Sequence, residues 1–314
     1  MRVFQRTKIS IFLNGVVPER VFYLRKMKIM CIFAGKYKEL LDMEKIGFMA
    51  IMLCLLFTAC DKDTQYFTME YPIAGDYTRL EVSSAFDVVV CDTVSSAVVT
   101  TSARMQQYVV VKVEDGVLTI KLRPNLVISR RGAKVLLPRN EQLCEVDLSG
   151  ASTFVGDLMG ENVELDISGS SDFEGTVRAT QVEMDLSGAS SFTGSINSEK
   201  VAMDLSGSSE MTGRIDATTI ELEAIGSSTV MAEGSCLDLL DLDLSGSSEF
   251  LSPQMDCRKV TGELSGSSDA DFNVCESLRV ALSGSSHIVY GVPTGCTPTV
   301  NCSTSGSSSV NTRQ

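Results

Sequence analysis

VEMDLSGASSFTG, residues 182–194, is the stretch of sequence that decides the fold, because near-copies of it recur through the second half of the chain. Aligned on the glycine of its Ser-Gly-(Ser/Ala)-Ser segment, the unit occurs nine times, at intervals of 18 to 22 residues. The aligned glycines are Gly150, Gly169, Gly188, Gly207, Gly226, Gly246, Gly266, Gly284 and Gly306. A period near 20 residues held over nine units is the sequence signature of a solenoid.

The pattern inside each unit indicates β-structure. Apolar residues stand two, four and six positions before the glycine, as at Leu186, Met184 and Val182, and polar residues such as Asp185 lie between them. Strict alternation is typical of a strand with one buried face. No single unit can bury that face alone, so the units must stack. We therefore predict an all-β protein whose residues 146–312 form a right-handed parallel β-helix, a single-stranded solenoid of about nine coils.

Residues 70–145 lack the repeat but contain alternating segments that we expect to be strands. The turn segment Glu114-Asp115-Gly116 predicts a hairpin between two of them. This β-rich N-terminal part is expected to cap the first coil, whose strand edge would otherwise be exposed. We assign residues 60–69 to a linker. The expected strands are residues 78–83, 86–91, 97–102, 108–113, 117–122 and 134–137.

The N-terminal residues indicate export. Residues 46–59 form an uncharged apolar run that is preceded by Lys45 and followed by Cys60. A run of this length is shorter than the ~20 residues of a membrane-spanning helix and has the size of a signal-peptide core. We assign residues 43–59 to a lipoprotein signal peptide and residues 1–42 to an extension created by calling the reading frame too early.

The four residues Phe57-Thr58-Ala59-Cys60 resemble a bacterial lipobox, in which the cysteine is acylated and becomes the first mature residue. Two or three acyl chains on Cys60 would hold the protein firmly at a membrane. The alternative is an ordinary signal peptide cut near Ala59. The predicted location is the cell envelope, as an outer-membrane lipoprotein that is either periplasmic or surface-exposed.

Charge separates the N-terminal segment from the rest. The whole chain has 27 basic and 40 acidic residues. Residues 1–60 contain ten basic and four acidic residues, which leaves 17 basic and 36 acidic residues, a net charge of −19, for residues 61–314. A body this acidic argues against nucleic acid as a partner and favours solubility or the binding of cations.

Three segments carry a resemblance to a known family. They are YTRLEVSSAFDVVV at residues 77–90, VKVEDGVLTI at residues 111–120 and VYGVP at residues 289–293, together with the serial LSGSS units. Over residues 70–312 the chain resembles the head GIN domain family of auto-transporter adhesins. The resemblance implies a pectin-lyase-like β-helix without catalytic residues, a role in adhesion and a Bacteroides-type lipoprotein. It offers no catalytic position to carry over to this chain.

Acidic residues recur at the same place in successive units. One column stands three residues before each glycine and comprises Asp147, Asp166, Asp185, Asp204, Glu223, Asp243 and Glu263. A second column stands two residues earlier and comprises Glu145, Glu164, Glu183, Glu221 and Asp241. Like charges at ~4 Å repel by ~1 kcal/mol even in water. Such a ladder would bind calcium or a basic partner surface, or it is a solvated face whose charge prevents lateral aggregation.

The composition argues against catalysis. The chain has one histidine and no tryptophan, and the serine two residues after each glycine occurs in all nine units. A hydroxyl repeated nine times has no unique base beside it, so we expect no serine nucleophile. We predict a non-catalytic adhesin or interaction module without a firmly assigned metal, whose surface ligand is a glycan or a protein. The alternative is a polysaccharide lyase or glycoside hydrolase that uses a pair of ladder carboxylates.

Seven cysteines follow Cys60, so at least one is unpaired if the others form disulfides. Four of them, Cys236, Cys257, Cys275 and Cys296, lie nine to twelve residues after successive repeat glycines. They are therefore expected near one corner of adjacent coils, as stacked thiols or as cross-coil disulfides. Cys296 and Cys302 are alternatively expected to close a short terminal loop.

Overall fold

The computed structural model describes residues 65–123 and 133–313, and about two thirds of them belong to β-strands. Apart from one 3₁₀ turn at Gln106–Tyr108, every regular element within these two ranges is a strand. The strands are β1 (Tyr66–Tyr71), β2 (Arg79–Val82), β3 (Phe86–Cys91), β4 (Ala97–Ser102), β5 (Val109–Glu114), β6 (Val117–Leu122), β7 (Ala133–Pro138), β8 (Glu145–Leu148), β9 (Thr153–Val155), β10 (Leu158–Ile167), β11 (Asp172–Leu186), β12 (Ser191–Leu205), β13 (Glu210–Ala224), β14 (Thr229–Leu244), β15 (Glu249–Leu264), β16 (Asp269–Leu282), β17 (His287–Gly291), β18 (Thr299–Val300), β19 (Ser303–Thr304) and β20 (Ser309–Thr312).

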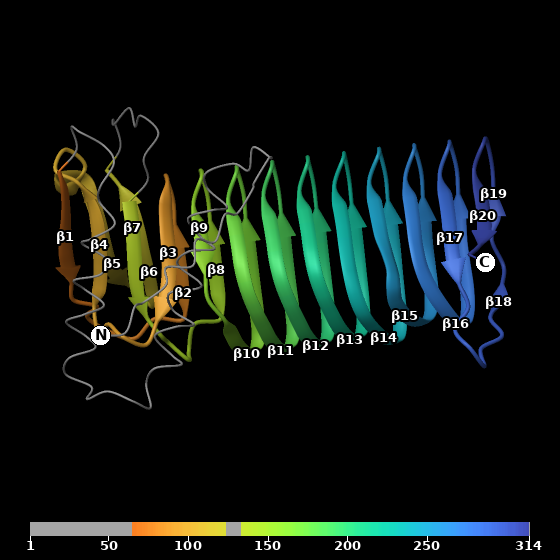
Figure 1. Cartoon of the computed structure of the whole chain (residues 1–314), viewed down its shortest axis with the longest axis horizontal. Coiled ribbons are helices and arrows are strands. Elements are labelled where there is room, and N and C mark those ends of the chain that lie inside the picture. Colours follow the sequence, from red (N-terminus) through yellow and green to blue (C-terminus); the bar gives the residue numbers. More distant parts are fainter. Residues whose placement is uncertain (1–64, 124–132, 314) are drawn as a thin grey trace, which may run out of the picture. The chain divides into compact units, whose positions relative to one another are not determined.

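In six of the nine repeat units the coil consists of a Ser-Gly turn followed by one long bent strand, β11 to β16. Successive strands β10 to β16 pair in parallel along most of their length, and Figure 1 shows them side by side with the turns aligned along one edge. The repeat of 19 residues appears directly in the register, where Leu186 of β11 pairs with Leu205 of β12. The predicted fold class, an all-β solenoid of about nine coils, is confirmed.

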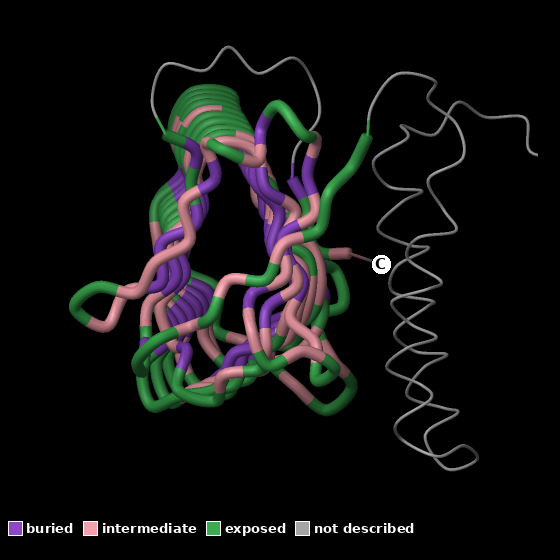
Figure 2. Tube along the Cα trace, turned by 90° about the vertical axis from the view of Figure 1, so that its left-hand side faces the viewer, coloured by how far each residue is buried: buried purple, intermediate pink, exposed green. Residues whose placement is uncertain are grey.

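The core is built from columns of identical or similar side chains. Viewed end-on, the buried residues line the inner side of the coil wall (Figure 2). Phe173 is 1% exposed, and its ring stacks on Phe154 and on Phe192 with ring centroids 5.2 Å apart in both pairs. Apolar side chains two, four and six residues before each glycine are buried as expected, as for Val182, Met184 and Leu186. The alternating pattern therefore gives each coil a dry inner face that only its neighbours complete.

The Ser-Gly turns stack so tightly that a side chain does not fit. Each repeat glycine has a φ between +73° and +93°, the left-handed region that favours glycine. A Cβ atom placed on Gly207 would lie 2.5 Å from the carbonyl oxygen of Gly188 in the preceding coil. That oxygen accepts a 2.8 Å hydrogen bond from the backbone N–H of Ser208, and equivalent bonds link all successive turns. The glycines are needed both for their conformation and for the close approach of neighbouring backbones.

The serine two residues after each glycine closes the turn. The first eight of these side chains, Ser152 to Ser286, are at most 1% exposed. In seven of the nine units the hydroxyl donates to the carbonyl oxygen three residues earlier, as from Ser209 to Ser206 at 2.7 Å. This bond supplies a buried partner for a polar group. The structural role fully accounts for the repetition of the serines.

The N-terminal part joins the solenoid out of sequence order. The pair β2–β3 lies between β6–β7 on one side and β8–β9 on the other, with all four contacts parallel. The turn between β2 and β3 is itself an earlier copy of the Ser-Gly turn, with Ser84 at φ +89° directly beneath Gly150. The sequence repeat was predicted to begin at Gly150, but the coil stack extends at least one coil further.

All six strands predicted before the repeats are present, within one residue at each end. One strand was missed, because β1 occupies residues 66–71 and part of the predicted 60–69 linker is therefore strand. Its residues are mostly exposed and show little apolar alternation, so the sequence carries no strand signal there. Strand β1 pairs antiparallel with β4, and β4 pairs antiparallel with β7. These antiparallel pairings end the parallel stack.

The predicted extension (residues 1–42), the predicted signal peptide (residues 43–59) and the lipidation candidate Cys60 lie outside the described residues. Within residues 65–123 and 133–313, no helix has the length and apolar character needed to cross a membrane.

Candidate binding surface

The strand register brings the residues of the predicted acidic ladder into one row. Its seven carboxylates come one each from β8 and β10 to β15, and the strand pairing places each directly beside the next. Six of them are exposed and Asp147 is half-buried. The residues are Asp147, Asp166, Asp185, Asp204, Glu223, Asp243 and Glu263. The strands hold like charges about 4.8 Å apart along one outer wall of the solenoid.

The second column runs parallel to the first. Glu145, Glu164 and Glu183 pair in register, and after Ala202 the column continues with Glu221 and Asp241. Lys200 stands two residues before Ala202 and forms an ion pair with Glu221 at 2.9 Å. The two columns together form what we call the acidic face.

Two residues of the acidic face were missed at the sequence level. The register continues the first column to Glu81, which pairs with Asp147, and the second column to Arg79, which pairs with Glu145. The Arg79 guanidinium lies 3.3 Å from Glu81 and 3.6 Å from Asp147, and it also forms an ion pair with Glu145. The sequence contains a pattern that would have revealed both residues. Residues 79–86 resemble the repeat unit, with Ser84 in place of the repeat glycine.

The crowding of carboxylates changes their acidity. The pKa of Asp185 is raised. The largest cause is partial burial of its carboxyl group, and the negative charges of Asp204 and Asp166 are the next causes. Burial also raises the pKa of Glu164, with Glu145 and Glu183 as the next causes. The pKa of Asp147 is raised by burial and by Asp166 even though Arg79 acts in the opposite direction. The carboxylates of the acidic face therefore repel one another, and this repulsion opposes their ionisation.

A shallow groove accompanies the first column across four coils. It has a volume of about 410 Å³, and its walls include Asp166, Asp185, Asp204 and Glu223. The apolar side chain of Ile225, which is 48% exposed, lines the same groove. The surface thus offers carboxylates in a row beside an exposed aliphatic contact.

The arrangement does not form a metal centre. Among the described residues, no group of three or more His, Cys, Asp or Glu side chains is placed to hold a metal ion. The strand register explains this result, because it sets the ladder carboxylates side by side in rows along the wall instead of around one point. Calcium prefers six to eight oxygen ligands, so the calcium hypothesis has no chelating site in the described part of the chain.

The carboxylates of the groove are also poorly arranged for hydrolysis of a glycoside. That reaction needs two carboxyl groups in different environments on opposite sides of the bond that breaks. Here the four groove carboxylates follow one another along a single wall. The geometry favours recognition over catalysis.

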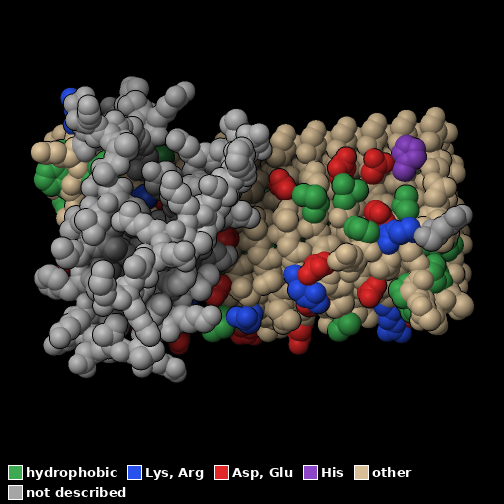
Figure 3. Space-filling model, viewed as in Figure 1, with side chains coloured by type: hydrophobic (Ala, Val, Ile, Leu, Met, Phe, Trp, Pro, Cys, Tyr) green, Lys and Arg blue, Asp and Glu red, His purple; other side chains and the backbone are tan. Residues whose placement is uncertain are grey.

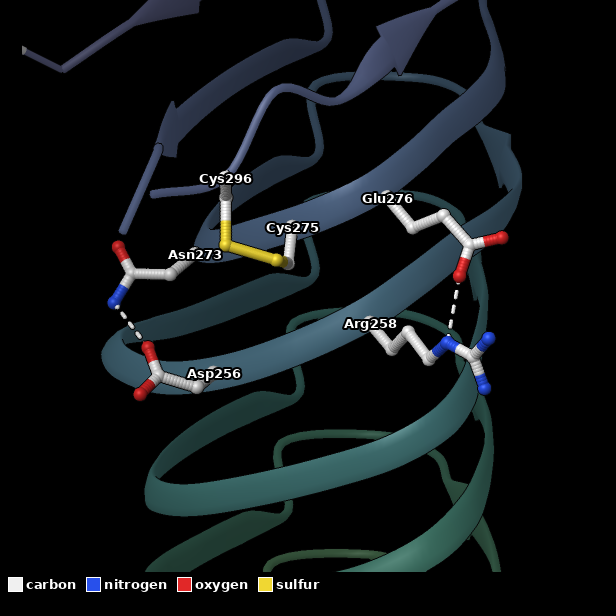
Figure 4. The surroundings of a disulfide bond; sticks show 6 residues. All are labelled: Asp256, Arg258, Asn273, Cys275, Glu276 and Cys296. Atoms are coloured by element: carbon white, nitrogen blue, oxygen red, sulfur yellow. Dashed lines mark hydrogen bonds and ion pairs between the residues drawn. A yellow bond between two sulfur atoms is a disulfide. The ribbon is translucent and has the colours of Figure 1, made fainter. Parts of the chain in front are cut away.

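The four cysteines that were expected near one corner include both a cross-coil disulfide and a pair of stacked thiols. Cys275 and Cys296 form a disulfide with 4.8 Å between their Cα atoms (Figure 4). Cys236 and Cys257 are free, buried and paired in register. Burial raises the pKa of Cys236 to about 11 and raises that of Cys257 well above 9.0, so both remain thiols at neutral pH. The predicted Cys296–Cys302 loop is wrong, because Cys296 bonds to Cys275 on the adjacent coil.

These features define a class of protein, a parallel β-solenoid that presents a repetitive charged wall and carries no evident catalytic centre among its described residues. The sequence model of the family described as "Putative auto-transporter adhesin, head GIN domain" matches residues 76–195 and 191–293. The chain therefore belongs to the head GIN domain family, as its sequence resemblance predicted.

Solved structures share the fold. One is a putative adhesin from Parabacteroides distasonis, with 19% identity, a TM-score of 0.59 and coverage of 80% of this chain and 98% of that one. A second, described as a putative lipid binding protein from the same species, has 21% identity, a TM-score of 0.53 and coverage of 79% and 97%. A putative adhesin from Parabacteroides merdae has 16% identity, a TM-score of 0.52 and coverage of 80% and 97%. No functionally curated protein matches the chain.

Repulsion along the ladder predicts that Asp185→Asn stabilises the protein. At pH 7 and low salt we expect the free energy of unfolding to rise by about 1 kcal/mol, because Asp185 lies between the like-charged Asp166 and Asp204. The pKa of Asp185 is raised in the folded state, so the wild type gains stability as the pH falls toward the ordinary value of 3.8. The advantage of the variant should therefore vanish near pH 4, and molar salt should reduce it at pH 7. Urea unfolding at each pH measures the difference.

Asp216→Asn is the matched control with the opposite sign. Burial opposes ionisation of Asp216, but hydrogen bonds from Arg214 and Ser235 outweigh it and lower its pKa. This variant should lose stability at pH 7 and match the wild type at acid pH. Equal responses of the two variants would contradict the account of the ladder.

Proposed function

We propose that this protein is a non-catalytic adhesin of the cell envelope, held at the outer membrane by acyl chains on Cys60, that binds basic protein segments along its acidic face. The observation that carries the proposal is the row of seven carboxylates in strand register. A regular row of like charges offers many equivalent contacts, which suits a surface to be bound. Family membership supports the adhesive role.

The chemistry of the acidic face favours arginine and lysine as contacts. Within the chain, the Arg79 guanidinium reaches three carboxylates of the face at once. Guanidinium groups recognise carboxylates through pairs of N–H donors, which makes such contacts directional. The groove beside the first column adds an aliphatic contact at Ile225 for the stem of a bound lysine or arginine. A solved relative is described as lipid binding, but the acidic face would repel anionic lipid.

The lipoprotein part of the proposal rests on the sequence. Residues 46–59 have the length of a signal-peptide core, and Cys60 follows Ala59 as in a lipobox. The described residues begin a few positions later, at the first strand of the solenoid. The Cys275–Cys296 disulfide supports an oxidising compartment such as the periplasm or the cell surface.

The test uses intact bacteria that make the full chain and a fluorescent oligo-arginine peptide as the probe. Cells with the wild-type chain should bind more peptide than cells without it, and external protease should remove the difference. Asp166→Asn, Asp185→Asn and Asp204→Asn combined should weaken binding about tenfold, since three neighbouring ionic contacts are lost. Added salt should weaken wild-type binding.

The control removes the same amount of charge elsewhere. Asp172→Asn, Glu210→Gln and Glu249→Gln combined neutralise three carboxylates of one column that follows the Ser-Gly turns, on β11, β13 and β15. This variant should bind the peptide within about twofold of the wild type, because net charge alone acts weakly at physiological salt. Equal losses in the two variants would exclude the acidic face as the binding surface. A chain that protease reaches only in broken cells would exclude the adhesin role.

A further inference from the structure

The last coil of the solenoid leaves a strand edge without a partner among the described residues. Strand β20 pairs with β17, and β18 and β19 pair with β16, each on one side only. In every earlier turn, the carbonyl oxygen of the repeat glycine accepts a hydrogen bond from the next coil, whereas in the described residues nothing bonds to that of Gly306. Figure 1 shows β20 at the end of the row of strands. An edge of this kind is a template for pairing with another strand.

The direction of the backbone groups can be read from the bonds that do form. The N–H groups of Ser309 and Arg313 donate back to Ser286 and Tyr290 in the coil beneath. In a parallel ladder alternate residues face opposite neighbours, so Val310 and Thr312 direct their backbone N–H and carbonyl groups outward. The core also ends here, since Val310 is only partly buried above the fully buried Ile288.

The last coil carries little of the charge that protects other edges. Between Arg279 and Arg313 the sequence has no Asp, Glu, Lys or Arg residue, although residues 61–314 carry a net charge of −19. On the face drawn in Figure 3, the surface nearest the C-terminal end is mainly uncharged. By contrast, the edge strands β1 and β5 at the other end include Glu70, Lys112 and Glu114. Proteins commonly block strand edges with such charges, and the C-terminal edge lacks them.

The uncharged edge is held rigidly in place. The Arg313 guanidinium donates to the carbonyl oxygen of Pro253 at 2.9 Å and to Asn273 at 3.0 Å, and it forms an ion pair with Asp271. The Cys275–Cys296 disulfide ties the preceding loop to β16. The Arg313 contacts and the disulfide already order this edge. Docking of a partner strand therefore costs less conformational entropy.

We propose that the C-terminal coil is a self-association surface, where two copies of this chain join end to end by pairing β20 of one with β20 of the other. The occupant is a second copy because, within the described residues, this region lacks the like charges that the acidic face carries. The side walls carry the acidic face, and two such walls repel each other. Joining identical edges about a two-fold axis produces a closed dimer.

Sedimentation of the full chain in non-ionic detergent tests the proposal. The wild type should pass from dimer to monomer on about a hundredfold dilution. Asn311→Lys, which places two like charges at the joint, and Thr312→Pro, which removes an outward N–H group, should each raise the dissociation constant at least about tenfold. Asn197→Lys, the same change at an exposed site of an interior coil, should match the wild type. Thermal melting checks that the variants are folded.

Salt gives an independent readout. Since the joint contains no ion pair and the bodies repel each other, added salt should strengthen the dimer. A wild type that is monomeric at every concentration would overturn the proposal. Dimerisation that Asn197→Lys weakens as much as Asn311→Lys, or that salt dissolves, would place the contact on a side wall. Growth beyond dimers would show that the N-terminal edge takes part. None of these outcomes bears on peptide binding by the acidic face.

Discussion

Replacing Gly207 with alanine should lower the free energy of unfolding by about 4 kcal/mol, whereas Gly116→Ala should lower it by only about 1 kcal/mol. Both glycines have a φ of +79°, so the conformational penalty of the new methyl group is the same. They differ in the space around the Cβ atom. At Gly116 no atom lies within 4 Å, but at Gly207 the carbonyl oxygen of Gly188 lies 2.5 Å away.

The clash at Gly207 cannot be relieved locally. The Gly188 oxygen accepts the hydrogen bond from Ser208, and the backbone on either side is locked into the ladder between β11, β12 and β13. Moving it disturbs two turns and breaks at least one buried hydrogen bond. Urea unfolding followed by circular dichroism measures both variants. If the two substitutions lower the free energy of unfolding equally, the repeat glycines are needed only for their positive φ and not for the close stacking of the turns.

The fold was predictable from the sequence because each unit repeats the same three signals. Alternation around residues such as Met184 gives a strand, the Ser-Gly pair gives the turn, and the 19-residue period gives the stacking. The threading of β2–β3 between β6–β7 and β8–β9 was not predictable. Alternation determines which face of a strand is buried, but it does not determine which neighbour the strand joins.

The acidic face was predictable for the same reason, since a fixed period in a parallel stack brings equivalent residues into contact. The cysteines show where this reasoning stops. Irregular coil lengths shift the register near the C-terminus, so that Cys257 pairs with Val274. Cys275 therefore lies one residue out of line with Cys257 and bonds to Cys296 in the other direction. Spacing placed four cysteines near one corner, but only the local register decided which of them pair.

Phe173→Ala should lower the free energy of unfolding by about 3 to 5 kcal/mol, because it empties the middle of a stack of three aromatic rings. The ring of Phe173 is 1% exposed and lies between Phe154 and Phe192, each with its ring centroid 5.2 Å away. The backbone ladder holds the coils about 4.8 Å apart, so neighbouring coils cannot collapse to fill the cavity. Phe67→Ala, at a site that is 41% exposed, should change the stability by less than about 1 kcal/mol.

A double-mutant cycle separates the ring stacking from simple burial. Phe173→Leu and Phe192→Leu, made singly and together, should show a coupling of about 0.5 to 1.5 kcal/mol, because the two rings are nearly parallel with an interplanar angle of 7°. The same cycle at Phe250 and Phe272, whose rings are 6.4 Å apart and tilted by 56°, should give a smaller coupling. If the two couplings are equal, the aromatic column stabilises the solenoid only through the apolar area that it buries, and any large apolar side chain would serve in its place.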